Sequence, residues 1–348
     1  MRYTNVVLAG IGYEMAPNVV KSADLEDRLK PVYKRLKLPE GRLEMMTGIR
    51  ERRFWNREGC PSQFAIKAGE AAIAKSGLSR SRIGAIFHAS VSRDFLEPAT
   101  ANIVHKGLGL IDSALTFDIS NACLGVLNGM VTIANMIELE QIEMGIVVAG
   151  EMGESLVNTT IDHLLKDKTL TRQSVKSAIA SLTIGSGAVA ILLCHKNIAS
   201  DAPALVGGVA GCDTDSVHLC QSNMDQGLHG DSVTFMKTDS EQLLYAGCAL
   251  AEKTWYRFLK VIGWSIDDIT RSFTHQVGVA HRKLLYESIG LNISLDYSTV
   301  EKLGNIGSVS LPITMAKGLE ENPAKKGEKA ALLGIGSGLN CLMLGLQW

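Results

Sequence analysis

Residues 117–130 read FDISNACLGVLNGM and join a strand-like run to a helical pattern. The β-branched and aromatic residues at 115–119 predict a buried strand, and apolar residues at helical spacing follow Cys123. A cysteine therefore stands where a strand meets the first turn of a helix. The N–H groups and the dipole at a helix start favour an anion, so we expect the pKa of the Cys123 thiol to be lowered from ~8.5 by one to several units.

Strand-like and helical patterns alternate on both sides of this join. The mostly apolar strands indicate a sheet covered on both faces, and the alternation indicates α/β layers. The strands are predicted at 5–12, 83–92, 115–120 and 144–151, and the helices at 24–39 (broken near Pro31), 62–78 and 123–141.

The chain carries an internal repeat. Three residue pairs are separated by 184 positions: Asn121 and Asn305, Cys123 and Gly307, and Gly150 and Gly334. The segments IGAIFHAS (83–90) and ITRSFTHQ (269–276) match at a similar offset. Two halves built on one plan explain these matches. We predict an N-terminal half over 1–165 and a C-terminal half over 166–348, with 164–176 and 206–227 as surface excursions.

A duplicated unit brings matching strand ends together across a pseudo-twofold axis. The corners equivalent to that of Cys123 hold His275 and Asn305, and Cys, His and Asn are the parts of a nucleophilic thiol site. The glycine-rich loop GIGSGLN (334–340) lacks the context of a dinucleotide site. It predicts either a simple turn or a turn whose N–H, together with that of Cys123, forms an oxyanion hole worth about 3 kcal/mol per donor.

Composition excludes several classes of function. A formal net charge of −1 gives no electrostatic case for nucleic acid or an anionic membrane, and we expect neither a signal peptide nor a membrane span. Seven cysteines without CxxC spacing argue against a disulfide framework or a zinc site, and the six-residue spacing of His275 and His281 suits metal poorly. We expect no metal and a reducing, cytoplasmic setting.

The motifs ISNACLG, HQVG, GNIGS, GIGSG and TGIRERRFW (47–55) resemble the thiolase-superfamily condensing enzymes, in particular 3-oxoacyl-ACP synthase III. The resemblance implies a duplicated five-layer α-β-α-β-α sandwich. It also implies that Cys123 is the acylated nucleophile, while His275 and Asn305 polarise or deprotonate the incoming donor. The amides of Cys123 and Ser337 would form the oxyanion hole.

The stretch VSRDFLEPATANIV (91–104) sets the subtype. It has Glu97 where synthase III typically places an apolar residue, and it is similar to the OleA-type enzymes of bacterial long-chain olefin biosynthesis, as are LGNIGSVSLPI, ALLGIGSGLNC and the terminal Trp348. The resemblance implies non-decarboxylative Claisen condensation of two long-chain acyl-CoAs to a 2-alkyl-3-oxo acid. It further implies a homodimer in which Glu97 enters the site of the partner subunit.

The chemistry of the reaction also favours a role for Glu97 as a base. A malonyl donor forms its carbanion by losing CO₂, whereas a plain acyl-CoA needs a base to remove its α-proton. A carboxylate in an apolar channel has the raised pKa suited to that task. The alternatives are a surface carboxylate, or an acid near a helix start. The rival activities are a decarboxylative synthase III acting on acyl-CoA and malonyl-ACP, an HMG-CoA-synthase-like enzyme, a degradative thiolase and a non-catalytic scaffold.

Long acyl chains suit the aliphatic composition, because each buried CH₂ contributes ~0.8 kcal/mol to binding. Arg50, Arg52 and Arg53 are candidates for contacts with CoA phosphates, with a solvated face as the alternative. We expect no cofactor besides the coenzyme A of the thioester substrates. Partner expectations are a second copy of the chain and an assembly with downstream olefin-pathway enzymes.

Overall fold

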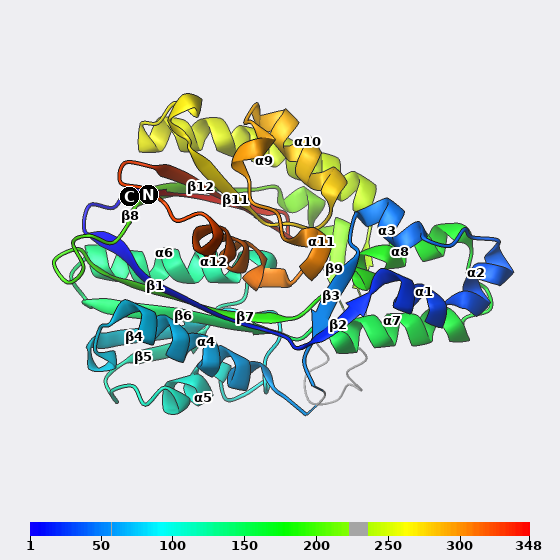
Figure 1. The fold of residues 1–348 in the computed structure, drawn as a ribbon, viewed down its shortest axis with the longest axis horizontal. Helices are drawn as coiled ribbons and strands as arrows, with labels where there is room; N and C mark the ends of the chain where they lie inside the picture. The colour runs from blue at the N-terminus through cyan, green and yellow to red at the C-terminus, as the bar shows by residue number, and fades with distance from the viewer. Residues whose placement is uncertain (57, 223–235) are drawn as a thin grey trace.

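The computed structural model describes residues 1–56, 58–222 and 236–348, and a nine-stranded sheet runs through these residues (Figure 1). Its order is β11-β12-β13-β8-β1-β7-β6-β4-β5. The two parts of the sheet meet between β1 and β8, which pair at Val7 and Ala204. The first part contains β1 (Val6–Met15), β4 (Ile83–His88), β5 (Leu115–Asp118), β6 (Met144–Glu151) and β7 (Gly187–His195). The second contains β8 (Ala204–Cys212), β11 (Arg271–Thr274), β12 (Lys329–Gly336) and β13 (Asn340–Gln347).

Both parts repeat one plan, which confirms the predicted internal repeat. In the first, the 3-10 turn η2 (Ala122–Leu124) leads into helix α6 (Gly125–Glu138). In the second, the 3-10 turn η7 (Gly307–Val309) leads into α12 (Ser310–Glu321). Strands β4 and β6 pair in parallel, as do β11 and β12. The corners of Cys123 and Asn305 are therefore equivalent positions of the two halves.

The elements form five layers, as predicted. Helices α6 and α12 lie in the central layer, where they share one hydrophobic core with both parts of the sheet (Figure 1). Helices α4 (Pro61–Ser76) and α5 (Thr100–Gly107) cover the outer face of the first part. Helices α9 (Ser240–Ile262) and α10 (Val279–Ile289) cover that of the second. Most strands are thus buried on both faces. The buried strand predicted at 115–119 is wrong, because β5 is an edge strand with Leu115 and Phe117 exposed.

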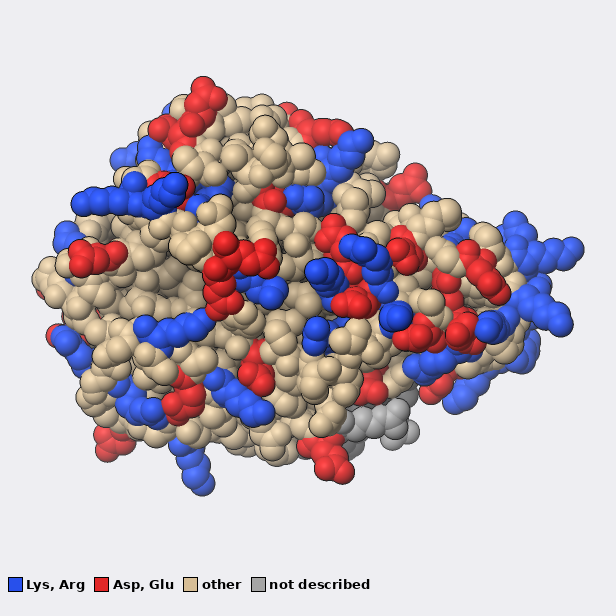
Figure 2. All heavy atoms as spheres, viewed as in Figure 1, with Lys and Arg blue, Asp and Glu red and all other residues tan. Residues whose placement is uncertain are grey.

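A lobe with its own core projects from one end of the layers (Figure 1). It consists of α1 (Ser22–Arg28), α2 (Lys30–Leu36), α3 (Arg42–Thr47), α7 (Glu154–Lys166) and α8 (Arg172–Leu182). The ribbon of β2 (Asn18–Lys21) and β3 (Glu51–Phe54) stands at its base, and short elements complete the described fold: α11 (Val300–Leu303), β9 (Cys220–Ser222) and β10 (Met236–Thr238). On the face in Figure 2, acidic and basic side chains are interspersed, and basic ones project at the tip of this lobe.

Two boundary predictions are wrong. Strand β7 pairs with β1 and β6, so the first half continues to His195 rather than ending at 165. Residues 206–212 belong to the inner strand β8 and not to a surface excursion. Their glycines resembled a loop in the sequence, but they serve close packing, because a Cβ at Gly211 would lie 2.5 Å from the hydroxyl of Thr254. Residues 223–227 of the predicted excursion lie outside the described residues.

Candidate active site

The segment after β5 places Cys123 at the start of the central helix α6. Ala122 has φ of 44°, a left-handed conformation that is unfavourable for a residue with a side chain. Gly125 begins the helix, and a Cβ there would lie 2.1 Å from the carbonyl oxygen of Ala89. Only glycine permits this close approach of the helix to the chain that follows β4. The strained turn and the glycine together hold the half-buried Cys123 at the corner predicted for it.

The glycine-rich turn lies against Cys123, as the oxyanion-hole prediction requires. A Cβ on Gly336, at the end of β12, would lie 3.5 Å from the backbone nitrogen of Cys123. Asn340, at the start of β13, donates from its side-chain nitrogen to the carbonyl of Ser337 and to Oδ1 of Asn121, each at 3.3 Å. The turn that carries Ser337 is thereby tied to the segment that carries Cys123.

Asn305 reaches the same centre from the second half. Its backbone N–H donates to the carbonyl of Thr183 at 3.0 Å, and its carbonyl accepts from the N–H of Gly185 at 2.9 Å. Its side-chain oxygen accepts from the N–H of Gly307 at 3.0 Å. Turns η2 and η7 pack against each other. The structure therefore brings the segments of Cys123 and Asn305 together, as predicted.

His275 follows β11 and is buried. Its N–H donates to the carbonyl of Leu333 in the neighbouring strand β12 at 3.0 Å. Its Nδ1 has no hydrogen-bond partner within the described part of the chain. Desolvation, with a smaller contribution from the nearby His281, lowers the pKa of His275 to about 3. The imidazole is therefore neutral at physiological pH.

The Cys123 thiol is also neutral, and the prediction of a lowered pKa is wrong. The pKa of Cys123 is raised to about 12, mainly by desolvation and to a smaller extent by the charges of Glu151 and Cys220, against a lowering by its own backbone N–H. The helix start favours an anion, but burial without a nearby cation outweighs it. Cys123 and His275 thus form a neutral thiol and a neutral imidazole rather than an ion pair.

This protonation state predicts slow alkylation of Cys123 in the resting enzyme. At pH 8 we expect iodoacetamide to modify Cys123 at least about tenfold more slowly than free cysteine, because only the thiolate reacts. Since the pKa is raised, the rate should climb with pH and show no plateau below about pH 10. Peptide mass spectrometry after timed alkylation measures the rate at each cysteine. A plateau near pH 7 would contradict the neutral thiol.

Glu151 belongs to the site, and the sequence analysis missed it. It is the last residue of β6 and is only 5% exposed. Its carboxylate accepts hydrogen bonds from Val91 and Ser92 on one side and from Ser308 on the other. The signal in the sequence was an otherwise apolar strand, MGIVVAGE, that ends on a carboxylate, whereas the matching position of the repeat holds Ile335.

Glu97 lies on an exposed loop. Its side chain makes no hydrogen bond or ion pair with the residues that the structure describes, and its neighbours Phe95 and Leu96 are 56% and 48% exposed. The apolar channel predicted around this carboxylate is therefore not provided by its own chain. The edge strand β5 likewise exposes Leu115 and Phe117.

The predicted CoA-phosphate contact is wrong for Arg52. Its side chain is fully buried and donates to the hydroxyl of Ser22 at 3.0 Å and to the carbonyl of Leu182 at 3.2 Å. Burial lowers the pKa of its guanidinium to about 10. Alternation along β3 turns Arg52 inward, whereas Arg53 is half-buried and Arg50, just before the strand, is exposed. For Arg50 and Arg53 the contact stays a prediction.

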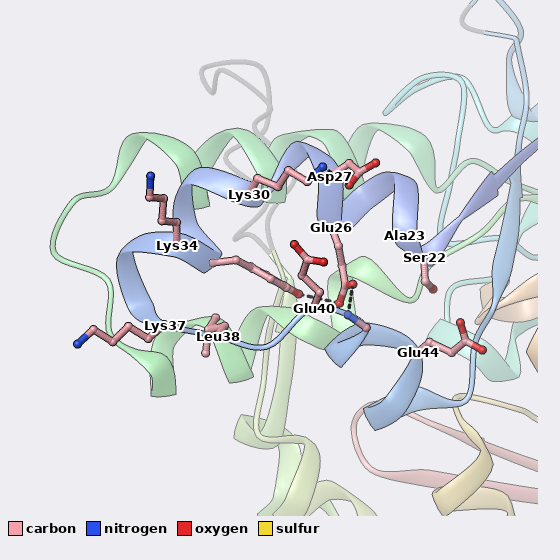
Figure 3. A pocket seen from close by; sticks show the side chains of 12 residues that line it. Ser22, Ala23, Glu26, Asp27, Lys30, Lys34, Lys37, Leu38, Glu40 and Glu44 are labelled. Carbon is pink, nitrogen blue, oxygen red and sulfur yellow. Dashed lines mark hydrogen bonds and ion pairs between the residues drawn. The ribbon is translucent and has the colours of Figure 1, made fainter.

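A surface cleft of about 580 Å³ lies in the projecting lobe, and Ser22, the partner of Arg52, is part of its lining. Figure 3 shows its lining from α1, α2, the loop that follows and α3. Glu26 and Glu40 point toward its middle, whereas Lys34 and Lys37 extend outward. The buried Glu26 accepts from the N–H groups of Gly41 and Leu43 and from the hydroxyl of Tyr33. None of the predicted site residues lines this cleft, and Glu26 holds the local loop together.

Comparisons with known proteins agree with this geometry. The family model described as the 3-oxoacyl-[acyl-carrier-protein] synthase III C terminal matches residues 259–348. The chain is 39% identical to the acyl-CoA:acyl-CoA alkyltransferase of Shewanella oneidensis and 35% identical to that of Xanthomonas campestris, with all of each chain covered. A synthase III structure from Xanthomonas oryzae also matches, with 36% identity, a TM-score of 0.93 and full coverage of both chains.

Solved structures of Xanthomonas campestris OleA are similar throughout. The cerulenin-bound form has a TM-score of 0.94 and 35% identity, and the alignment covers 100% of this chain and 98% of that one. Variants of that protein replace a glutamate and a cysteine that are 26 positions apart, the same separation as Glu97 and Cys123 here. Another variant, with serine for that cysteine, holds lauric acid and lauroyl-CoA.

Proposed function

Because the chain belongs to the acyl-CoA:acyl-CoA alkyltransferases, the OleA family, we propose that its head-to-head condensation of two acyl-CoAs runs through an acyl-Cys123 intermediate. The observation that carries this proposal is the convergence of Cys123, the Ser337 turn and the Asn305 turn at one point between the two halves. His275 approaches from the strand next to that turn. Thiol, imidazole, amide and backbone donors are the groups that acyl transfer needs.

The first half-reaction loads the enzyme. The Cys123 sulfur attacks the thioester carbonyl of the first acyl-CoA, and the backbone amides of Cys123 and Ser337 stabilise the oxyanion. The thiol proton passes to the neutral imidazole of His275 during attack and then to the sulfur of the departing coenzyme A. A thiol that is neutral at rest ionises only while its proton is transferred. Loading therefore leaves Cys123 as an acyl thioester and His275 as a neutral imidazole.

The second half-reaction forms the carbon–carbon bond. The partner subunit's Glu97 removes an α-proton from the second acyl-CoA, and His275 and Asn305 hold the resulting enolate oxygen by hydrogen bonds. The enolate carbon attacks the acyl-Cys123 carbonyl and expels the Cys123 thiolate, which takes up the proton. Water then hydrolyses the remaining thioester, which releases coenzyme A and a 2-alkyl-3-oxo acid. A neutral His275 suits the role of hydrogen-bond donor to the enolate.

A homodimer formed through β5 would allow Glu97 of one subunit to reach the active site of the other. Strand β5 is the edge of the sheet, and its Leu115 and Phe117 are 48% and 38% exposed. Val91, Phe95 and Leu96 extend the exposed apolar surface into the loop of Glu97. An apolar edge strand is a template for pairing with a second chain. Covering this surface would desolvate the Glu97 loop and bring it over the partner's site.

Long-chain acyl-CoAs are the proposed substrates, since a variant of the Xanthomonas campestris relative binds lauric acid and lauroyl-CoA. We place the product at the start of long-chain olefin formation, where enzymes that reduce a 2-alkyl-3-oxo acid would consume it and could assemble with this chain.

A cytoplasmic setting would keep the Cys123 thiol reduced. The described residues contain no helix long and apolar enough to cross a membrane.

Incubation with myristoyl-CoA alone tests the proposal. We expect release of free coenzyme A and a product that contains two acyl chains, detected by a thiol assay and by mass spectrometry. A second incubation contains myristoyl-CoA together with malonyl-ACP. It tests the decarboxylative synthase III reaction, because a synthase III structure from Xanthomonas oryzae also matches this chain. Product formation that requires malonyl-ACP would refute the non-decarboxylative reaction.

A further inference from the structure

Glu151 is a buried carboxylate with five hydrogen-bond donors and no role in the steps above. Oε1 accepts from the N–H of Val91 at 3.0 Å and from the N–H and hydroxyl of Ser308 at 3.2 and 2.6 Å. Oε2 accepts from the N–H and hydroxyl of Ser92 at 3.1 and 3.0 Å. All five donors are uncharged. A buried carboxylate is costly unless its oxygens are satisfied, and here neutral donors alone satisfy them.

These donors come from the two loops that the condensation uses. Val91 and Ser92 begin the loop that reaches Glu97, and the Ser92 hydroxyl also accepts from the N–H of Met152 at 2.9 Å. On the other side, Ser308 lies three residues after Asn305. A Cβ at Gly307 would lie 3.1 Å from Oε1, so the carboxylate packs directly against the Asn305 turn. One side chain therefore anchors both loops.

The same carboxylate acts electrostatically on the nucleophile. Its negative charge raises the pKa of the Cys123 thiol, as does Cys220 from β9 to a smaller extent, while the Cys123 backbone N–H lowers it. These are the groups whose charges or hydrogen bonds act on the sulfur. Removing the charge of Glu151 should therefore be felt at Cys123, whereas removing a distant carboxylate should not.

We propose that Glu151 is a positioning residue for the condensation: it holds the Asn305 turn and the base of the Glu97 loop in fixed relation behind Cys123. The assignment rests on the proposed roles of Asn305 and Glu97. Because the enolate must meet both the acyl-enzyme and its hydrogen-bond donors, a displacement of the Asn305 turn by about 1 Å would slow the reaction by about 10²-fold. Substrate binding along the acyl chain does not depend on this anchor.

The variant Glu151→Gln tests the assignment, because it keeps the size of the side chain but removes the charge and turns one acceptor into a donor. We expect kcat for condensation of myristoyl-CoA to fall about 10- to 100-fold while KM changes little. At pH 9 we expect alkylation of Cys123 to accelerate about tenfold, since one neighbouring negative charge is lost. The matched control is Glu26→Gln, which alters another buried, loop-holding carboxylate and should leave both readouts at wild-type values.

Unchanged kcat in Glu151→Gln, or unchanged alkylation of Cys123, would overturn the assignment. If that variant does not fold, Ser308→Ala removes only one hydroxyl donor, and it should lower kcat several-fold with KM retained; wild-type kcat in that variant overturns the assignment as well. Failure of the proposed function can be distinguished from failure of this assignment, because the wild-type enzyme would then yield no product containing two acyl chains. The alkylation difference between Glu151→Gln and Glu26→Gln needs no acyl-CoA and still reports whether Glu151 faces Cys123.

Discussion

Cys123→Ala is expected to abolish acyl-enzyme formation and to reduce condensation by at least about 10⁴-fold, because no other group can form the thioester intermediate. Cys123 is the cysteine held between the Gly336 turn and the Asn305 turn, whereas Cys194, Cys248 and Cys341 are packed in hydrophobic cores. Radiolabelled myristoyl-CoA, followed by denaturation and intact-mass analysis, measures the covalent adduct.

The matched control for this experiment is Cys212→Ala, which removes an exposed free cysteine. It should retain both the adduct and the condensed product. Label that persists in Cys123→Ala after digestion and peptide mapping would identify a different nucleophile and remove the assignment of Cys123.

Glu97→Ala is expected to separate the two half-reactions. Loading of Cys123 needs no α-proton removal, so the acyl-enzyme should form at the wild-type rate. Carbon–carbon bond formation should drop by about 10²- to 10⁴-fold, the range of a lost general base. Single-turnover loading with labelled myristoyl-CoA and product mass spectrometry measure the two steps separately. Glu97→Gln should behave in the same way, because an amide of the same shape cannot accept the proton.

Mixed dimers decide which subunit supplies Glu97. When Cys123→Ala and Glu97→Ala chains are co-assembled, a glutamate acting across the interface leaves each heterodimer with one complete site. Random pairing should then restore about a quarter of the wild-type condensation rate. A base that serves its own chain would give no restoration. Wild-type yield from Glu97→Ala alone would remove the base role altogether.

Much of the fold could be predicted because matching residues recur at a fixed separation in the two halves of the sequence. The separation of Asn121 from Asn305 by 184 positions located two equivalent corners, and the structure places η2 and η7 at these corners in contact. The strand-to-helix join at Cys123 was visible because period-2 and period-3.6 patterns change over within a few residues.

The remaining features depend on surroundings that a local pattern does not contain. Whether Arg52 points inward depends on the lobe that covers β3, and the pKa of Cys123 depends on how many neighbours exclude water from it. Strand β7 was assigned to the wrong half because the two lobe helices α7 and α8 separate it in sequence from the strands that it pairs with. Glu151 was missed because its donors come from two segments that are distant from it in the sequence, at Val91–Ser92 and at Ser308.

The central layer also limits how the molecule can be divided. Helix α6 shares one core with the two parts of the sheet and with α12, and eight of its fourteen residues are buried. A polypeptide severed between β7 and β8 would leave each fragment with half of that interior uncovered. The repeat units are thus not autonomous modules, and unfolding of either one removes the support of the other.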